Sequence, residues 1–276
     1  MKVGFIGLGS QGGPMARRIV EGGYDTTLWA RRPATLEPFA DTPAKVAESP
    51  AELAAASDLV CLCVVGDTDI EELTGGEHGL LAAMKPGGVI AVHSTVHPDT
   101  CRALAKQAAA QGVSVIDAPV SGGGGAAEQR RLLVMVGGDT DVVERCRPVF
   151  ETYADPIVHL GELGSGQTTK LLNNLLFTAH LSTAASLLSL GSSLSVDPTR
   201  LAEVIQHGSG NSFALEKVAL VGGKLDVMAQ VAGPLLRKDV RLVSEVAAAA
   251  GVPITELAGT VLAAANDALG LMGEEP

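Results

Sequence analysis

The segment Val3-Gly-Phe-Ile-Gly-Leu-Gly-Ser-Gln-Gly12 decides the fold of the N-terminal half of the chain. Its first four residues form an apolar run typical of a buried strand, and residues 11–21 have the pattern of a helix. Between them, Gly7, Gly9 and Gly12 match GxGxxG, in which glycines permit a tight turn, close approach of a pyrophosphate and close helix–strand packing. The N-terminus of the helix after such a turn favours anions. The sequence therefore predicts a dinucleotide site that comprises Gly7, Leu8, Gly9, Ser10, Gln11 and Gly12.

Strand-like and helical segments alternate after this loop. Helices are expected over residues 51–56, 99–111 and 141–152, between apolar runs rich in β-branched residues. This alternation predicts a doubly wound, mostly parallel sheet of the Rossmann type, with helices on both faces. The expected strands cover residues 3–6, 26–29, 59–65, 89–93, 113–116, 132–136 and 157–159.

The pattern changes after Gly161, because no further strand alternation follows. We expect a dinucleotide-binding domain over residues 1–161 and an all-helical substrate and oligomerisation domain over residues 162–276, with a long helix between them. That helix is apolar, but asparagine, histidine and six serines interrupt residues 171–196, which favours burial between protein layers over a membrane span. The expected helices cover residues 165–194, 198–207, 214–221, 233–250 and 254–269.

The composition limits the class of protein. The 276 residues are 46% hydrophobic and 18% charged, which is typical of a soluble globular protein and excludes a disulfide-stapled miniprotein. The net charge of −11 and an aromatic content of 3% disfavour nucleic acid as a partner, and the charge also disfavours anionic membranes. Four cysteines without a CxxC pair indicate a reducing compartment, and strand-like sequence from Lys2 leaves no room for a signal peptide. We therefore expect a cytoplasmic protein, and the scattered histidines predict no metal site.

The residues after the second expected strand bear on the choice of cofactor. An acidic side chain at this point would bind the adenosine ribose of NAD, but the sequence reads Leu28-Trp-Ala-Arg-Arg-Pro33. A guanidinium group suits the 2′-phosphate of NADP instead. We therefore predict NADP as the preferred cofactor, with contacts from Arg31 and Arg32, and NAD as a second cofactor that the site could take. The alternative is that both arginines are solvated loop residues.

Three stretches of the chain carry a family resemblance. They are residues 7–16 (GLGSQGGPMA), 117–123 (DAPVSGG) and 161–174 (GELGSGQTTKLLNN), and Lys238-Asp239 is a shorter fourth match. Together they span almost the whole chain in the family's order. On these residues the chain resembles the β-hydroxyacid dehydrogenases, which include 3-hydroxyisobutyrate dehydrogenase and tartronate semialdehyde reductase. A more distant likeness is to 6-phosphogluconate dehydrogenase.

The resemblance implies that Lys170 is the catalytic lysine. A hydroxyl group must lose a proton when its carbon loses hydride, and burial or a nearby helix N-terminus would lower the pKa of a lysine toward this role. Asn174 lies four residues later on the same helical face, where its amide could hold the substrate oxygen. Ser121, Gly122 and Gly123 follow an expected strand, at the edge of the sheet where ligands bind. Their backbone N–H groups and the Ser121 hydroxyl suit a substrate carboxylate.

The resemblance also implies further cofactor contacts. Ser94-Thr95 resembles the contact to the nicotinamide side, Val64 belongs to the same cofactor site, and Lys238 resembles a second lysine brought from the helical domain to close it. Two positions depart from the family pattern: Arg130-Arg131 stands where the family has Gly-Thr, and Ala30 stands where it has the asparagine of Asn-Arg-Thr. We expect the two arginines to face solvent, and the alternative is contact with a second acidic group of the substrate.

These features predict an NADP-dependent oxidoreductase that interconverts a short β-hydroxyacid and its semialdehyde. A lysine would act as acid and base, and the protein would be a homodimer or homotetramer that acts on a small molecule. An imine reductase is the alternative enzyme, although the resemblance implies that such enzymes generally lack a lysine at position 170. A non-catalytic NADP-binding interaction module is the third reading, and it would not need Lys170, Ser121 or Asn174.

Overall fold

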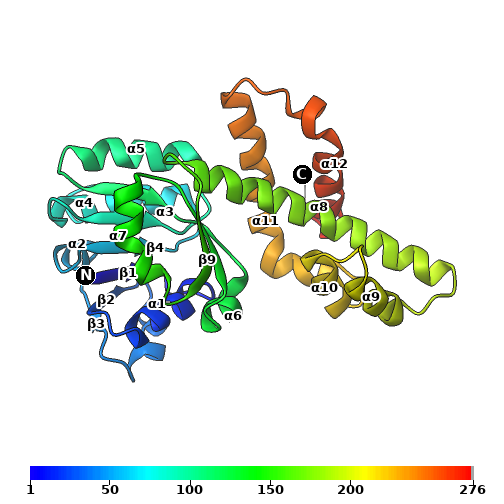
Figure 1. The fold of residues 1–276 in the computed structure, drawn as a ribbon, viewed down its shortest axis with the longest axis horizontal. Helices are drawn as coiled ribbons and strands as arrows, with labels where there is room; N and C mark the ends of the chain where they lie inside the picture. The colour runs from blue at the N-terminus through cyan, green and yellow to red at the C-terminus, as the bar shows by residue number, and fades with distance from the viewer. Residues whose placement is uncertain (275–276) are drawn as a thin grey trace. The chain divides into compact units, whose positions relative to one another are not determined.

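The N-terminal unit is built around six parallel strands in the order β3-β2-β1-β4-β5-β6 (Figure 1). The computed structural model describes residues 1–274, without the side chains of residues 230 and 231. The strand order reverses beside β1, and open sheets of this kind bind ligands at the carboxyl ends of the strands next to that point. The glycine loop directly follows β1 there. The strands are β1 (Val3–Ile6), β2 (Thr26–Trp29), β3 (Lys45–Val46), β4 (Leu59–Leu62), β5 (Val89–Val92) and β6 (Ser114–Asp117).

Both faces of this sheet are buried, which explains the nearly continuous apolar strands. In β1, Phe5 points into a core shared with α1 (Gly12–Glu21) and α7 (Thr140–Phe150), whereas Ile6 belongs to the core on the opposite face. Two short 3₁₀ helices, η1 and η2, follow β2. The remaining bounds are α2 (Pro50–Ala55), α3 (Asp67–Thr74), α4 (Leu80–Ala83) and α5 (Pro98–Ala109) on the second core, with η1 (Pro33–Thr35) and η2 (Glu37–Phe39).

A second sheet of three strands lies in the same unit, in the order β7-β8-β9. Strand β8 (Leu132–Val136) pairs antiparallel with β7 (Val120–Ser121) and parallel with β9 (Ala154–His159). The two-residue strand β7 and the glycine-rich helix α6 (Gly123–Glu128) were not expected, because neither is long or periodic enough to mark an element in the sequence. Pairing with β8 fixes the backbone of Ser121.

Strand β4 is shorter than expected. The apolar run continues to Val65, but the strand ends at Leu62. The N–H of Val64 donates to the hydroxyl of Ser94 at 2.8 Å instead of to a neighbouring strand, so the chain leaves the sheet at this point. The same hydrogen bond holds Val64 close to the carboxyl end of β5.

Helix α8 (Ser165–Ser193) begins in the first unit, which ends at Lys170, and continues into the second, which begins at Leu171. The described residues of the second unit form helices around a core of mainly Ala, Leu and Val. By length and composition alone α8 could cross a membrane, and core helices of soluble proteins share this property. The other helices are α9 (Pro198–His207), α10 (Phe213–Leu220), α11 (Asp226–Ala249) and α12 (Ile254–Leu271).

Helix α11 starts at Asp226, well before the expected start at residue 233. The expectation placed Pro234 in the first turn, where proline is favoured, but Pro234 lies inside the helix. Residues ahead of it, including Met228 and Ala232, pack against the helical core, and this burial offsets the cost of an internal proline. The architecture as a whole confirms the predicted fold class, a doubly wound parallel sheet followed by helices that include one long helix.

Candidate active site

The three glycines of the loop meet different requirements. Gly7 has φ +100°, and a Cβ atom there would lie 2.0 Å from the carbonyl oxygen of Cys63. A Cβ atom at Gly12 would lie 2.0 Å from the carbonyl oxygen of Gly7. Nothing lies within 4 Å of the corresponding position at Gly9. The turn and the helix packing therefore require Gly7 and Gly12, whereas Gly9 leaves the backbone open to a ligand.

The N-terminus of α1 is only partly open to an anion, because the N–H of Gly13 donates to the carbonyl oxygen of Gly9 at 2.8 Å and Pro14 has no N–H. Gln11 is the N-cap residue, but no side chain caps the helix, and the Gln11 amide lies 3.6 Å from the sulfur of Met15. A helix N-terminus carries partial positive charge, and those of its N–H groups that have no partner need acceptors. A pyrophosphate would supply them, so the loop fits a dinucleotide cofactor. Leu8 is buried within this loop and Ser10 is exposed.

Arg31 lies beyond the end of β2 and pairs with acidic side chains of α3. Its guanidinium is 3.2 Å from Asp69 Oδ1 and 3.2 Å from Glu72 Oε2, and its side chain is 62% exposed. Ion pairs this exposed contribute little to stability, so a phosphate group could compete for the same cation. Arg32 is also exposed.

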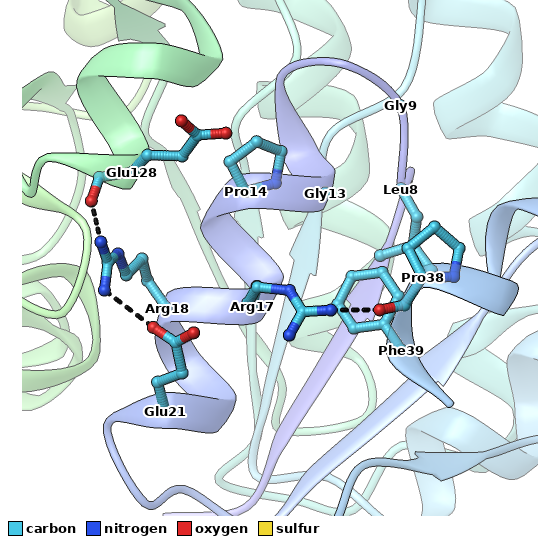
Figure 2. A pocket seen from close by; sticks show the side chains of 10 residues that line it. All are labelled: Leu8, Gly9, Gly13, Pro14, Arg17, Arg18, Glu21, Pro38, Phe39 and Glu128. Atoms are coloured by element: carbon cyan, nitrogen blue, oxygen red, sulfur yellow. Dashed lines mark hydrogen bonds and ion pairs between the residues drawn. The ribbon is translucent and has the colours of Figure 1, made fainter. Parts of the chain in front are cut away.

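A pocket opens beside the glycine loop, between α1 and the chain around Pro38 (Figure 2). Two arginines of α1 line it. Arg17 stacks over Phe39 and pairs with Asp41 at 3.0 Å, and Arg18 pairs with Glu21 at 2.8 Å. Their guanidinium groups also donate to the backbone oxygens of Pro38 and Glu128, respectively. Protein acceptors therefore already engage both cations.

Ser121, Gly122 and Gly123 form a half-buried to exposed turn between β7 and α6. Gly122 has φ +128° and Gly123 has φ +77°, conformations that favour glycine. The glycines leave backbone groups open at the surface next to the Ser121 hydroxyl. This arrangement offers donors of the kind that a carboxylate needs.

Lys170 is the sixth residue of α8 and is nearly buried, at 9% exposed. The start of this helix is held by the carboxylate of Asp117, at the end of β6. Asp117 Oδ1 accepts the N–H of Gly164 at 2.7 Å, and Oδ2 accepts the N–H of Gln167 at 2.6 Å. Burial raises the pKa of Asp117, against the opposing effect of these two donors. Sequence reasoning assigned no role to Asp117, although it opens one of the matched stretches.

In the second unit, one buried carboxylate joins two expected site residues. The amide nitrogen of Asn174 donates to Asp239 Oδ2 at 2.6 Å, and Lys238 Nζ lies 3.0 Å from Asp239 Oδ1. Asp239 is 4% exposed. It orients Asn174 through this hydrogen bond and forms an ion pair with Lys238, a role that the sequence reading missed because Asp239 was noted only as the neighbour of Lys238.

The remaining expectations concern the surface and metals. Arg130 and Arg131 are both exposed, and Arg131 donates to Gln129. Thr95, next to Ser94, is half-buried. Among residues 1–274, no group of three or more His, Cys, Asp or Glu side chains could hold a metal ion.

Two family models match consecutive parts of the chain. Residues 2–161 match the NAD binding domain of 6-phosphogluconate dehydrogenase, and residues 164–274 match a model described as NAD-binding of NADP-dependent 3-hydroxyisobutyrate dehydrogenase. The 2-(hydroxymethyl)glutarate dehydrogenase of Eubacterium barkeri is 33% identical over 280 residues, which cover 100% of this chain and 92% of that protein.

Solved structures share the fold. Mycobacterium tuberculosis 3-hydroxyisobutyrate dehydrogenase with L-serine is 26% identical, with a TM-score of 0.79 over 99% of this chain and 98% of that chain. Psf3 in complex with NADP⁺ is 28% identical, with a TM-score of 0.78 over 88% and 86% of the two chains. A Streptomyces aurantiacus imine reductase, at 19% identity and a TM-score of 0.69 over 100% and 96%, is similar in fold.

A doubly wound sheet with a GxGxxG loop, followed by a helical domain, defines an NAD(P)-dependent oxidoreductase acting on a small molecule. The chain belongs to the 3-hydroxyisobutyrate dehydrogenase family of β-hydroxyacid dehydrogenases. This confirms the resemblance that the sequence motifs indicated, and with it the expectation of an enzyme.

Proposed function

We propose that the protein is an NADP-dependent dehydrogenase that interconverts a short β-hydroxyacid and its semialdehyde. The observation that carries this proposal is Lys170, nearly buried on the first part of α8, whose start is fastened to the carboxyl end of β6. Such a lysine can serve as a general acid and base. The E. barkeri relative is named for a hydroxymethyl acid, and the M. tuberculosis structure holds L-serine, which is itself a β-hydroxyacid.

The cofactor supplies or accepts hydride, and the chain orients the substrate and moves the proton. In the reducing direction, protonated Lys170 donates to the carbonyl oxygen, and in the oxidising direction neutral Lys170 accepts the hydroxyl proton. Asn174 lies one helical turn further along α8 and donates a hydrogen bond to the same oxygen. The Ser121 hydroxyl and the N–H groups of Gly122 and Gly123 bind the substrate carboxylate.

Within the second unit, Asp239 supports this chemistry through its contacts with two side chains. It accepts a hydrogen bond from Asn174, which orients the amide before substrate arrives, and it balances the charge of Lys238. We assign Lys238 to the cofactor side of the site, as a cation that closes it. The division that we propose is a dinucleotide-binding domain over residues 1–161 and a substrate and oligomerisation domain over residues 162–276.

NADP is the proposed cofactor because the residues directly after β2 include Arg31 and no carboxylate. Arg32 is a second candidate for the 2′-phosphate. The glycine loop Gly7–Gly12 binds the pyrophosphate, and Val64 and Thr95 line the nicotinamide side. The Psf3 structure, which holds NADP⁺, supports this choice.

A homodimer or homotetramer is the proposed assembly. Three large apolar side chains are exposed in the single chain: Leu187 and Leu190 of α8, at 43% and 55%, and Leu194, directly after the helix, at 68%. Exposing large apolar side chains to water is unfavourable, and a second copy of the chain would cover them. All four cysteines are free thiols, which supports a reducing compartment, and we propose the cytoplasm.

The test is a spectrophotometric panel that combines semialdehydes, β-hydroxyacids and cyclic imines with NADPH, NADH and their oxidised forms. We expect turnover of one or more semialdehydes with NADPH and of the matching hydroxyacids with NADP⁺. Turnover of imines alone would overturn the proposal in favour of an imine reductase. Turnover of none of the three classes would overturn it as well.

A further inference from the structure

A continuous hydrogen-bonded network joins α8 to the carboxyl ends of three neighbouring strands. One part is the carboxylate of Asp117, described above, which accepts two N–H groups at the start of the helix. Charge-assisted hydrogen bonds of this kind are among the stronger ones in proteins, and a negative charge is favoured at a helix N-terminus.

The other part is the side chain of Gln167, which is 0% exposed. Its Oε1 accepts the N–H of Val96 at 3.1 Å, and its Nε2 donates to the carbonyl oxygen of Ser94 at 2.8 Å. Ser94 in turn accepts the N–H of Val64 through its hydroxyl, at 2.8 Å. The chain after β4, the chain after β5 and the first turn of α8 are thereby linked through Gln167 and Ser94.

The surroundings of Asp117 are shaped around its carboxylate. A Cβ atom at Gly137 would lie 2.4 Å from Asp117 Oδ1, and one at Gly166 would lie 2.8 Å from Oδ2. Any side chain at either position would displace the carboxylate from the N–H groups that it binds. Two glycines from different parts of the chain therefore enclose one buried charge.

Resting on the proposed role of Lys170, we propose that Asp117 and Gln167 are positioning residues for that lysine. Gln167 lies three residues before Lys170 on α8, so its bonds to Ser94 and Val96 fix the part of the helix from which Lys170 projects. The same bonds fix the chain beside Thr95 and Val64, where the nicotinamide side of the cofactor is proposed. The network thus fixes the position of the proton-transfer group relative to the hydride-transfer site. Small displacements of such groups lower the reaction rate strongly.

The test is a double-mutant cycle in the full-length enzyme. Gln167→Leu keeps the approximate size of the side chain and removes both of its hydrogen bonds. We expect kcat to fall about 10- to 100-fold, while the dissociation constant of NADPH, measured by fluorescence, changes less than threefold. In a Lys170→Ala background the same substitution should lower kcat by a clearly smaller factor, because the part of its effect that acts through Lys170 is already lost.

Thr168→Val is the matched control. Thr168 is the next residue of α8, but its hydroxyl donates to the carbonyl oxygen of Gly164, directly before the same helix, at 2.9 Å. We expect less than a twofold change in kcat. Asp117→Asn, which retains an acceptor for one of the two N–H groups, should lie between the wild type and Gln167→Leu. If Asp117→Asn fails to fold, the cycle with Gln167→Leu decides alone.

The outcomes separate this inference from the proposed function. If Gln167→Leu lowers kcat by the same factor with and without Lys170, the positioning role is overturned while the role of Lys170 stands. An unchanged kcat in Gln167→Leu overturns it too. If Lys170→Ala itself keeps near wild-type turnover, the proposed function fails first.

Discussion

The amide nitrogen of Asn174 donates to Asp239 at 2.6 Å, although 65 residues separate the two in the chain. On its other side, the amide oxygen of Asn174 accepts from Asn173 at 3.0 Å. These partners decide which way the amide is turned, since a carboxylate can only accept. The remaining N–H of Asn174 is a donor, which suits the carbonyl or alkoxide oxygen of the proposed substrate and not a group that must itself donate.

Lys170→Ala should lower turnover by roughly 10²–10⁴-fold, as for removal of a positioned general acid and base. NADPH should still bind, because the glycine loop is a separate part of the first unit. The measurement is kcat at saturating substrate and cofactor, with cofactor affinity followed by fluorescence quenching.

Lys170→Arg distinguishes proton transfer from charge alone. Guanidinium keeps the positive charge but does not give up its proton near neutral pH, so this variant should fail almost as badly as alanine. Near wild-type turnover in the arginine variant would instead assign Lys170 to carboxylate binding and move the proton relay to Lys238.

Arg31→Ala should raise the KM for NADPH far more than the KM for NADH, because only NADPH carries the 2′-phosphate. A hydrogen bond to a charged group contributes about 1.5–3 kcal/mol, which corresponds to roughly ten- to a hundredfold. Arg32→Ala tests the second candidate, at the next position, in the same way. Equal effects of Arg31→Ala on both cofactors would show that the phosphate binds elsewhere, with Arg32 as the next candidate.

Substitution of the acidic partners of Arg31 should change the KM for NADPH in the opposite direction. Removing both carboxylates, with Asp69→Asn and Glu72→Gln, leaves the guanidinium without the ion pairs that compete with a phosphate. The KM for NADPH should fall, and the KM for NADH should change little. A rise in the KM for NADPH would indicate that these carboxylates hold Arg31 in its binding position.

Gly9→Ala and Gly12→Ala should separate binding from folding. The methyl group at residue 9 meets nothing within 4 Å, so stability should stay within about 0.5 kcal/mol of wild type while cofactor affinity falls. At residue 12 the methyl group would lie 2.0 Å from a backbone oxygen, so both stability and affinity should fall. Urea unfolding and cofactor titration measure the two effects, and unchanged affinity in Gly9→Ala would contradict the loop assignment.

His93 should make the first unit sensitive to acid. Burial lowers the pKa of His93 to about 4 from an ordinary 6.5, against the opposing effect of its 2.7 Å hydrogen bond to the carbonyl oxygen of Ala118. Because the folded pKa is the lower one, the unfolded chain binds the extra proton. The stability that neutral His93 provides is therefore complete above pH 6.5 and is lost as pH falls toward 4. At pH 5 the loss should be about 2 kcal/mol.

Trp29 allows this loss to be measured, since it is the chain's one tryptophan and lies on β2 of the first unit. Urea unfolding followed by its fluorescence at pH 7 and pH 5 gives the change in the free energy of unfolding. His93→Gln should reduce that change by about 2 kcal/mol, and His78→Gln, at an exposed position, should not. An identical pH dependence in wild type and His93→Gln would contradict the prediction.

Light scattering at micromolar concentration should give the mass of a dimer or tetramer. Replacing the exposed side chains of Leu190 and Leu194 with glutamate should shift the mass toward the monomer, because a charge in an apolar interface is costly. Val46→Glu, which places the same charge at an exposed apolar position of the first unit, is the control. A monomeric mass for the wild type would remove the proposed assembly.

The parallel sheet could be predicted because its strands are buried on both faces. Such strands read as unbroken apolar runs, as in β4 and β5, and helices with regular apolar spacing separate them. Strands β3 and β7 could not be predicted, since each has two residues and exists only through its pairing with a neighbour. The end of β4 depends on the Ser94 hydroxyl, which no local pattern reveals.

The candidate site was predictable where a residue has a local signature. The three glycines of the first loop are an example, because turn, ligand approach and helix packing each fix one of them. Asp117, Gln167 and Asp239 lacked such a signature. Their roles arise from partners 47, 73 and 65 residues away in the chain, and only the folded arrangement shows those contacts.

The buried carboxylate of Asp117 also bears on the order in which the chain is synthesised. All six strands of the main sheet lie within residues 3–117, but both backbone partners of the carboxylate, Gly164 and Gln167, come later. Until residue 167 has left the ribosome, the sheet carries a charge that is costly to bury without partners. A nascent chain released at residue 161 would have every strand and still lack this closure. The opening turn of the long helix is thus the last piece that the cofactor-binding half requires.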